Sequence, residues 1–109
     1  MKTKFELIRE WASNKGIYEK GDVKTQYVKF QEEAGELAKS IMKDDYDEFV
    51  DAIGDCVVVL TNLAELGNKY FEGKDKISIE YCIDSAYNVI KNRTGRMENG
   101  TFKKDDETV

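Results

Sequence analysis

Acidic side chains lie on the apolar faces of two predicted helices. Glu33 follows Phe30 by three residues and precedes Leu37 by four, so it shares the apolar face of an amphipathic helix. Glu36 lies at the edge of that face, and in the next helix Asp55 is directly followed by five apolar residues. An ionised carboxylate in such a place is costly unless it is paired, hydrogen-bonded or bound to a metal. The pattern predicts a cation shared by the two helices, or acids at the rim of the core that reach Lys or Arg; the number of acids favours the cation.

More acids fall at helical spacing around these three. Glu32 and Glu36 are four residues apart, and Glu48, Asp51 and Asp55 are spaced by three and four on the next helix. The short acidic connection predicts that the two helices are antiparallel neighbours, which brings the two groups of acids together. The chain has no histidine, so a metal site would be built from oxygen ligands. Such a site favours Mg²⁺, with Mn²⁺ as an alternative.

A metal site of this kind predicts chemistry on a phosphate-bearing substrate. The metal would lower the pKa of a bound water, a carboxylate would position or deprotonate that water, and basic side chains would help to stabilise the developing charge. Lys29 lies on the first acidic helix, and Lys91, Arg93 and Arg96 form a basic cluster later in the chain. For each of these residues taken alone, ordinary solvated charge is the favoured interpretation. No glycine-rich phosphate-binding loop is present, which excludes a P-loop nucleotidase.

Composition limits the class of protein. The 109 residues predict one domain, and the absence of proline suits long helices. Lys and Arg total 17 against 22 for Asp and Glu, and the net charge of −5 argues against broad binding to nucleic acid or an anionic membrane. The charged first residues do not form a signal peptide, and the longest apolar run is too short to cross a bilayer. We therefore expect a soluble cytoplasmic protein with reduced, packed thiols at Cys56 and Cys82.

Hydrophobic periodicity predicts an all-α fold of four helices. The helices are expected at about residues 5–12, 23–43, 47–66 and 78–91 or 78–93, with a loop at 16–22. Trp11 is interpreted either as a core anchor or as a wall against which a base stacks. Asn99-Gly100 predicts a hairpin-like turn, and the residues beyond Phe102 are expected to be disordered. We therefore expect the chain to consist of one helical domain at residues 1–97 and a C-terminal tail at residues 98–109.

Four segments of the chain form a more specific pattern. They are Ile8-x-x-Trp11-Ala12, Gln26-x-x-Lys29-x-x-Glu32-Glu33-Ala34-Gly35-Glu36-Leu37, Asp51-Ala52-Ile53-Gly54-Asp55, and Ala86-Tyr87-Asn88-Val89-Ile90-Lys91-Asn92-Arg93 followed by Gly95-Arg96-Met97-Glu98-Asn99-Gly100-x-Phe102. In this order they resemble the MazG-like all-α nucleoside triphosphate pyrophosphohydrolases, especially small phage and bacterial single-domain members. The resemblance covers most of the chain.

The resemblance implies an activity and an assembly. It implies Mg²⁺-dependent hydrolysis of a nucleoside triphosphate to the monophosphate and pyrophosphate, by a helical bundle completed in a homodimer or homotetramer. A phosphoribosyl-ATP pyrophosphatase shares the architecture and is an alternative, as is a catalytically silent helical dimer that binds a nucleotide or a protein. The preferred base and sugar, the oligomer size and the physiological role are left open by the sequence.

The resemblance also implies a ligand set. The EExxE half of the family motif maps onto Glu32, Glu33 and Glu36. The second half, ExxD, maps onto Ala52 and Asp55, so one expected ligand is missing. Asp51, one turn before Asp55, is the candidate substitute, and Glu48 with Asp51 also fits ExxD in an earlier register. The expected metal ligands are Glu33, Glu36, Asp51 and Asp55, with Glu32 and Glu48 as candidates for outer positions or a second metal.

Other site residues are carried over in the same way. By this resemblance Trp11 would contribute to the nucleobase pocket. Asn88, Lys91 and Arg93 would contact substrate phosphates, and Lys29 is included among the substrate-binding residues. Glu33, Glu36 and Asp55 are expected to be the catalytic acids.

Overall fold

Helices dominate residues 1–105, the part of the chain that this computed structural model describes. The chain divides into two compact units, Met1–Ile79 and the part that begins at Glu80. The predicted all-α class is confirmed, with one small hairpin added. The elements are α1 (Lys4–Asn14), α2 (Ile17–Lys20), α3 (Val23–Met42), α4 (Tyr46–Tyr70), α5 (Ile79–Ile90), β1 (Gly95–Glu98) and β2 (Thr101–Lys104).

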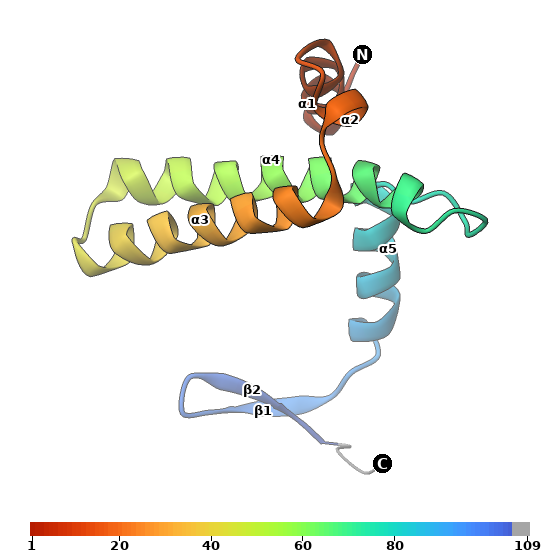
Figure 1. The fold of residues 1–109 in the computed structure, drawn as a ribbon. Coiled ribbons are helices and arrows are strands. Elements are labelled where there is room, and N and C mark those ends of the chain that lie inside the picture. Colours follow the sequence, from red (N-terminus) through yellow and green to blue (C-terminus); the bar gives the residue numbers. More distant parts are fainter. Residues whose placement is uncertain (106–109) are drawn as a thin grey trace. The chain divides into compact units, whose positions relative to one another are not determined.

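The first unit is built on an antiparallel pair, α3 and α4, which lie side by side in Figure 1. Each helix is capped at its start by an aspartate, Asp22 for α3 and Asp45 for α4. Oδ1 of Asp22 accepts a hydrogen bond from the backbone N–H of Thr25 at 2.8 Å, and Oδ1 of Asp45 accepts one from Glu48 at 3.0 Å. Asp44, between the helices, has a φ of 55°. The short connection therefore makes α3 and α4 antiparallel neighbours, as predicted.

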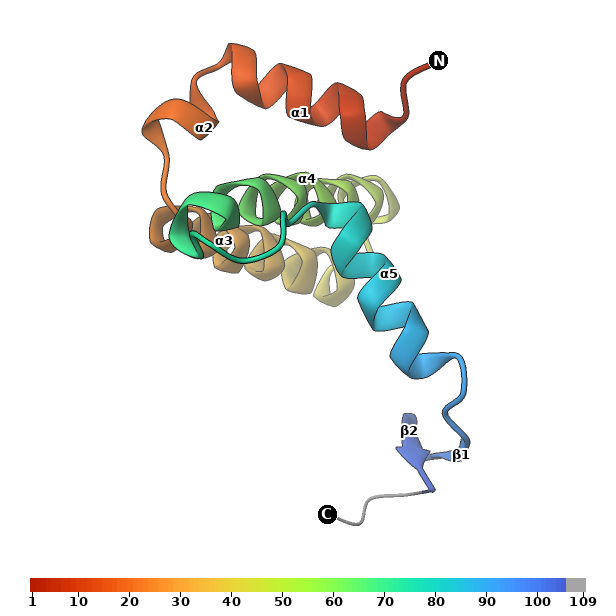
Figure 2. The ribbon, with the colours of Figure 1, turned by 90° about the vertical axis from the view of Figure 1, so that its right-hand side faces the viewer.

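The N-terminal helices α1 and α2 both pack on α4, and Figure 2 shows α1 beside that helix. Thr3 and Glu6 form a capping box at the start of α1, with backbone-to-side-chain hydrogen bonds of 3.1 and 2.7 Å. The predicted loop at residues 16–22 is wrong in part, because Ile17–Lys20 form the single turn of α2. Gly16 starts this turn with a φ of 82°, a conformation that glycine adopts without steric cost.

The end of α4 also differs from the prediction. The helix continues to Tyr70, whereas Gly67 was expected to end it after Leu66. Gly67 is buried, and a Cβ there would lie 3.3 Å from Cδ1 of Ile77. The side-chain amide of Asn68 then holds the same loop, accepting from the N–H of Ile77 at 2.6 Å and donating to its carbonyl at 2.8 Å. The absence of a side chain at Gly67 thus lets Ile77 pack closely against α4.

The core of the described residues is small and partly polar. Its apolar members are Ala12, Ala52, Cys56, Val59 and Leu66. Three polar side chains are buried with them, Ser40, Thr61 and Asn62, and each takes part in a hydrogen bond. Cys56 is a buried free thiol as expected, but Cys82 is exposed, so its predicted packing is wrong.

The second unit consists of most of α5 followed by the β1–β2 hairpin. Asn99 and Gly100 both have positive φ, 51° and 80°, as a tight hairpin turn requires, and Met97 pairs with Phe102. Lys103 and Lys104 lie in β2, so disorder beyond Phe102 is wrong for these two residues. Residues 106–109 lie outside the described part of the chain.

The division between the compact units falls between residues 79 and 80. The helical domain at 1–97 with a tail at 98–109 stays a prediction. Among the described helices, none combines the length and apolar character needed to cross a membrane.

Candidate functional site

Two acids on facing helices line one cavity in the first unit. Glu33 lies eleven residues before Asp44 in α3, and Asp55 lies eleven residues after it in α4. Since the two helices rise by the same length per residue, residues equally far from the turn lie at about the same height along the pair. The cavity has a volume of about 420 Å³. Its lining consists of Trp11, Ile17, Thr25, Gln26, Lys29, Glu33, Asp55, Val58, Val59 and Asn62.

Lys29 holds one of these acids. Its Nζ lies 3.2 Å from Oε1 of Glu33 and 3.7 Å from a carboxylate oxygen of Glu32. Glu33 is the less accessible partner, with 15% of its side chain exposed against 52% for Lys29. The hydrogen bond that Lys29 donates to the Glu33 carboxylate is the main reason that the pKa of Lys29 is raised. The cavity therefore holds a cation that stays protonated.

Asp55 lies in a field that opposes its ionisation. Burial raises the pKa of Asp55 above its ordinary value, and the charges of Glu33 and Asp51 raise it further, whereas Lys29 lowers it. The pKa of the neighbouring Cys56 thiol is also raised, first by burial and then by Glu33 and Asp55. The acids of α3 and α4 are thus close enough to repel one another, as the sequence pattern predicts.

The other predicted ligands lie outside this cavity. Glu36 and Asp51 are exposed, although Asp51 is near enough to affect Asp55. Glu32 is exposed and shares Lys29 with Glu33. Glu48 is at the turn end of the pair, where Lys43 lies 3.4 Å from its carboxylate.

The donor chemistry of these acids suits a divalent cation. Carboxylate oxygens are the ligands of Mg²⁺ and Mn²⁺, and a cation would relieve the repulsion that raises the pKa of Asp55. Within residues 1–105, no three Cys, Asp or Glu side chains stand close enough together to hold a metal as they are placed. Glu33 is instead engaged by Lys29, so a metal there would require its carboxylate to change partner. The predicted four-ligand set remains a prediction.

Trp11 lines this cavity and an adjoining one of about 380 Å³. The adjoining cavity is bounded by Lys4, Leu7, Ile8, Trp11, Asp55 and Val58. Half of the surface of Trp11 is exposed, while Ala12 beside it is fully buried. Ala12 therefore anchors α1 in the core, and Trp11 presents its ring to the space beside Asp55. The core-anchor interpretation of Trp11 is not supported.

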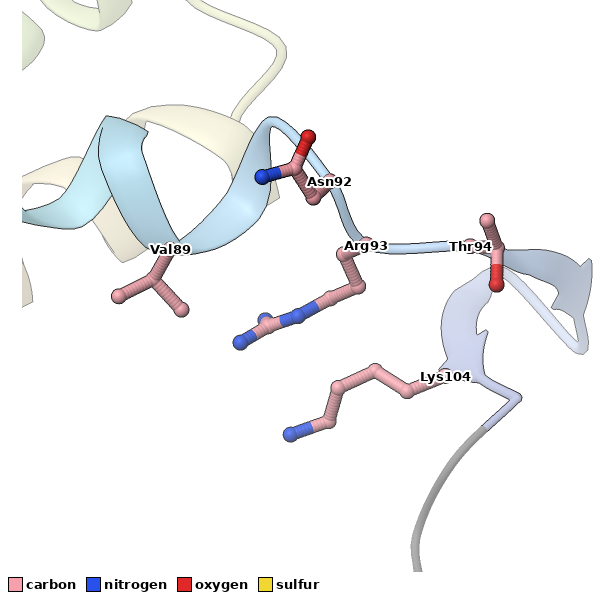
Figure 3. A pocket seen from close by; sticks show the side chains of 5 residues that line it. All are labelled: Val89, Asn92, Arg93, Thr94 and Lys104. Carbon is pink, nitrogen blue, oxygen red and sulfur yellow. The ribbon is translucent and has the colours of Figure 1, made fainter.

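A separate cavity of about 280 Å³ lies in the second unit, and two basic side chains, Arg93 and Lys104, line it (Figure 3). It is lined by Val89, Asn92, Arg93, Thr94 and Lys104. Lys104 reaches it because β2 pairs with β1, and the N–H of Asp105 donates to the carbonyl of Thr94 at 3.0 Å. The side chains of Arg93 and Lys104 extend in the same direction in Figure 3.

Of the basic residues predicted to contact phosphate, only Arg93 lines this cavity. Asn88 and Lys91 are exposed elsewhere on the unit, and Arg96 forms an ion pair with Glu98 at 2.5 Å.

Sequence reasoning overlooked four residues that line the main cavity or hold its wall. Gln26 and Asn62 are each eighteen residues from Asp44, so the pairing rule that relates Glu33 to Asp55 would have found them. Thr25, next to Gln26 on α3, also lines the cavity. Tyr18, whose hydroxyl donates to Asn62, gives no signal in the sequence because its segment is predicted to be a loop.

Comparison with known proteins agrees with this arrangement. Residues 21–97 match the family described as MazG nucleotide pyrophosphohydrolase domain. The chain belongs to the MazG family. The match includes α3, α4, α5 and most of β1, and hence every acid predicted to bind a metal, whereas Trp11 and Tyr18 precede it. The MazG assignment makes the chain a member of a hydrolase family that acts on phosphoric anhydrides.

One phage protein is similar to part of this MazG chain. An uncharacterised 18.2 kDa protein from the rep-hol intergenic region of Haemophilus phage HP1 (strain HP1c1) is 38% identical over 58 residues. The aligned segment covers 53% of this chain and 36% of the phage protein, so the chain spans about a third of that relative's length. No solved structure matches the chain.

Proposed function

We propose that this MazG-family protein is a Mg²⁺-dependent nucleoside triphosphate pyrophosphohydrolase that converts a ribo- or deoxyribonucleoside triphosphate and water to the monophosphate and pyrophosphate, in the cytoplasm. The observation that carries the proposal is the cavity that brings Glu33, Asp55 and Lys29 together with the half-exposed ring of Trp11. Four helices contribute to the lining of this cavity, and two of them, α3 and α4, lie within the family match. Acids, a cation and an aromatic ring are the groups needed to bind a nucleotide and to hydrolyse its phosphates.

In the proposed mechanism the chain's own groups have distinct roles. Glu33, Glu36, Asp51 and Asp55 would hold the metal, with Glu32 and Glu48 as outer candidates. When bound, the metal would supply charge neutralisation at the phosphates and a more acidic water. A carboxylate of the cavity accepts a proton from the attacking water as the new oxygen–phosphorus bond forms at the α-phosphorus. The bond from that phosphorus to the bridging oxygen breaks, and pyrophosphate leaves.

Other residues bind and orient the substrate. Lys29 places its ammonium group beside the acids, where it offsets negative charge on the phosphate oxygens. Trp11 offers its ring as a stacking surface for the base. In the second unit, Asn88, Lys91 and Arg93 are proposed to contact substrate phosphates, and the basic lining around Arg93 and Lys104 supports an anion-binding role for that unit.

We also propose that the protein is a homodimer or homotetramer. The support comes from the first unit, where apolar side chains of α4 stay exposed beside the small core: Phe49, Val50, Ile53, Val57 and Leu60. A Cβ placed on Gly54, in the same segment, would meet no atom within 4 Å, so another surface can approach closely. Light scattering coupled to size exclusion would give the mass, and a monomer at micromolar concentration would contradict this part of the proposal.

The activity is tested with a panel of nucleotides and Mg²⁺. Pyrophosphate release from the common ribo- and deoxyribonucleoside triphosphates, and from phosphoribosyl-ATP, identifies the substrate class. Glu36→Gln and Asp55→Asn should each lose most of that activity, because each removes a proposed metal ligand. If either variant hydrolyses the panel as fast as the wild type, the proposal is wrong.

A second candidate function is binding without turnover, and residue 52 is the observation that favours it. Ala52 occupies the position where the family motif expects an acid, and it is only 4% exposed. A chain that lacks this ligand would bind a nucleotide and release no pyrophosphate. Calorimetry separates the two functions: heat of binding with no pyrophosphate after long incubation favours the silent binder.

A further inference from the structure

A buried side-chain amide is held in one orientation at the wall of the main cavity. The hydroxyl of Tyr18 donates a hydrogen bond to Oδ1 of Asn62 at 2.7 Å. Asn62 is 2% exposed, yet it lines the cavity. The backbone carbonyl of Tyr18 accepts a hydrogen bond from Nζ of Lys69 at 2.8 Å, which fastens α2 to the far part of α4. Asn62 therefore exposes only a small part of its side chain to the cavity.

The contact with Tyr18 determines what Asn62 can offer to a ligand. A side-chain amide has an oxygen that accepts and a nitrogen that carries two hydrogens to donate. Because Oδ1 already accepts from Tyr18, the groups that remain available are chiefly the two hydrogens on Nδ2. Burial raises the pKa of Tyr18 to about 12, so its hydroxyl keeps its proton and stays a donor at neutral pH. The amide thus presents a fixed donor.

Asn62 is placed at a useful distance from the acids. It follows Asp55 by seven residues on α4, which is two helical turns on the same face and ~10 Å along the axis. This separation is comparable with that between the α-phosphate and the base of a nucleotide. The ring of Trp11 lines the same cavity as both residues. A nucleotide with its phosphates at the acids would bring its base toward the amide.

We propose that Asn62 reads the base of the substrate by donating from Nδ2 to a base carbonyl, and that Tyr18 is the residue that positions it. This inference rests on the proposed function. A fixed donor favours bases with a carbonyl on the recognised edge, uracil, thymine and guanine, over cytosine and adenine, which carry an amino group there. Gln26 lies level with Asn62 and also carries an amide, but Asn62 is the one whose orientation the tyrosine fixes.

A purely structural role for the Tyr18–Asn62 contact makes a different prediction. If the contact only joins α2 to α4, removing it lowers stability and leaves the choice of base unchanged. Lys69→Met provides the matched control, because Lys69 joins the same two helices through the backbone of Tyr18 without touching the amide. The discriminating quantity is the ratio of kcat/KM for UTP to that for CTP, two substrates that differ at position 4 of the ring.

The experiment measures this ratio for the wild type, Tyr18→Phe, Asn62→Asp and Lys69→Met. One neutral hydrogen bond corresponds to about a tenfold preference for UTP in the wild type. Tyr18→Phe should bring the ratio close to one, because the side-chain amide of Asn62 can then rotate by about 180° and present its oxygen instead of its nitrogen. Asn62→Asp, which replaces the donor with an acceptor, should favour CTP, and Lys69→Met should retain the wild-type ratio.

Other outcomes overturn the inference. A wild type that prefers CTP, or an unchanged ratio in folded Tyr18→Phe, shows that Asn62 does not read the base. If Asn62→Asp fails to fold by circular dichroism, the conservative Tyr18→Phe decides the question. Calorimetric binding of UMP and CMP is measured in parallel. A wild type that hydrolyses no nucleotide of the full panel refutes the proposed function, while the preference between the two monophosphates still tests the role of Asn62.

Discussion

Replacing Glu33 by glutamine separates the catalytic role of this acid from its structural role. The substitution keeps the size and shape of the side chain and removes its charge. Glu33 and Asp55 line the same cavity, and Oε1 of Glu33 lies 3.2 Å from Nζ of Lys29 in an ion pair. We expect a loss of activity that is large compared with the loss of stability.

The structure limits the stability cost. Lys29 and Glu33 are four residues apart on α3, with the lysine first, the less favourable order for such a pair. Because the lysine side chain is 52% exposed, solvent screens the pair, and its contribution is at most about 0.5 kcal/mol. That corresponds to about 2–4 °C in Tm for a domain of this size. The loss of a group that holds a metal or accepts a proton would reduce kcat about 100-fold, or ~2.7 kcal/mol in the activation free energy.

The assay pairs initial rates of pyrophosphate release with thermal unfolding of the same samples. Glu10→Gln is the matched control, since it makes the same change of charge and breaks an exposed ion pair between Glu10 on α1 and Lys2, which precedes that helix. The control should retain the activity and the Tm of the wild type. The reasoning is refuted if folded Glu33→Gln stays within about twofold of the wild-type rate, and equally if its Tm falls by ~10 °C, which would make Glu33 a structural residue.

Three further changes test the packing and the electrostatics. Ala52→Glu places a carboxylate at a position that is 4% exposed, so urea unfolding without metal should show a loss of about 2 kcal/mol or more; unchanged stability would contradict the burial of residue 52. Leu66→Ala removes a side chain that is 3% exposed and should cost about 2–5 kcal/mol by the same measurement; a loss below ~1 kcal/mol would show that Leu66 is not a core residue. The pKa of Asp22 is lowered from its ordinary value of 3.8, chiefly by the hydrogen bond from the backbone of Thr25. The stabilisation from this cap is complete above pH 3.8 and is lost as the pH falls through the lowered pKa, so Asp22→Ala should lower Tm at pH 7 and much less at pH 2.

The α3–α4 pair and its caps could be predicted because their signals are local. Apolar residues recur at helical spacing, and Asp22 and Asp45 precede the helices that they cap. The short connection then fixes the antiparallel arrangement. From these facts alone, Glu33 and Asp55 are expected to face each other, and the structure places both at one cavity.

What could not be predicted depends on contacts between residues distant in sequence. Gly67 looks like a helix stop, but Ile77 packs against it and α4 continues. Glu36, at the edge of the apolar face that includes Glu33, is predicted to be a ligand as well, yet of these two acids only Glu33 lines the cavity and pairs with Lys29. Spacing assigns a residue to a face, whereas its burial depends on which neighbouring helix covers that face.

The turn between α3 and α4 sets the alignment of the whole cavity wall. Glu33 meets Asp55, and Gln26 meets Asn62, because each pair is equally distant from Asp44. One residue inserted into α4 between the turn and Asp55 would shift the rest of that helix by ~1.5 Å and rotate it by about 100° relative to α3, which separates every such pair at once. Among homologues, the number of residues between Glu33 and Asp55 should therefore vary much less than the length of the loop at residues 71–78.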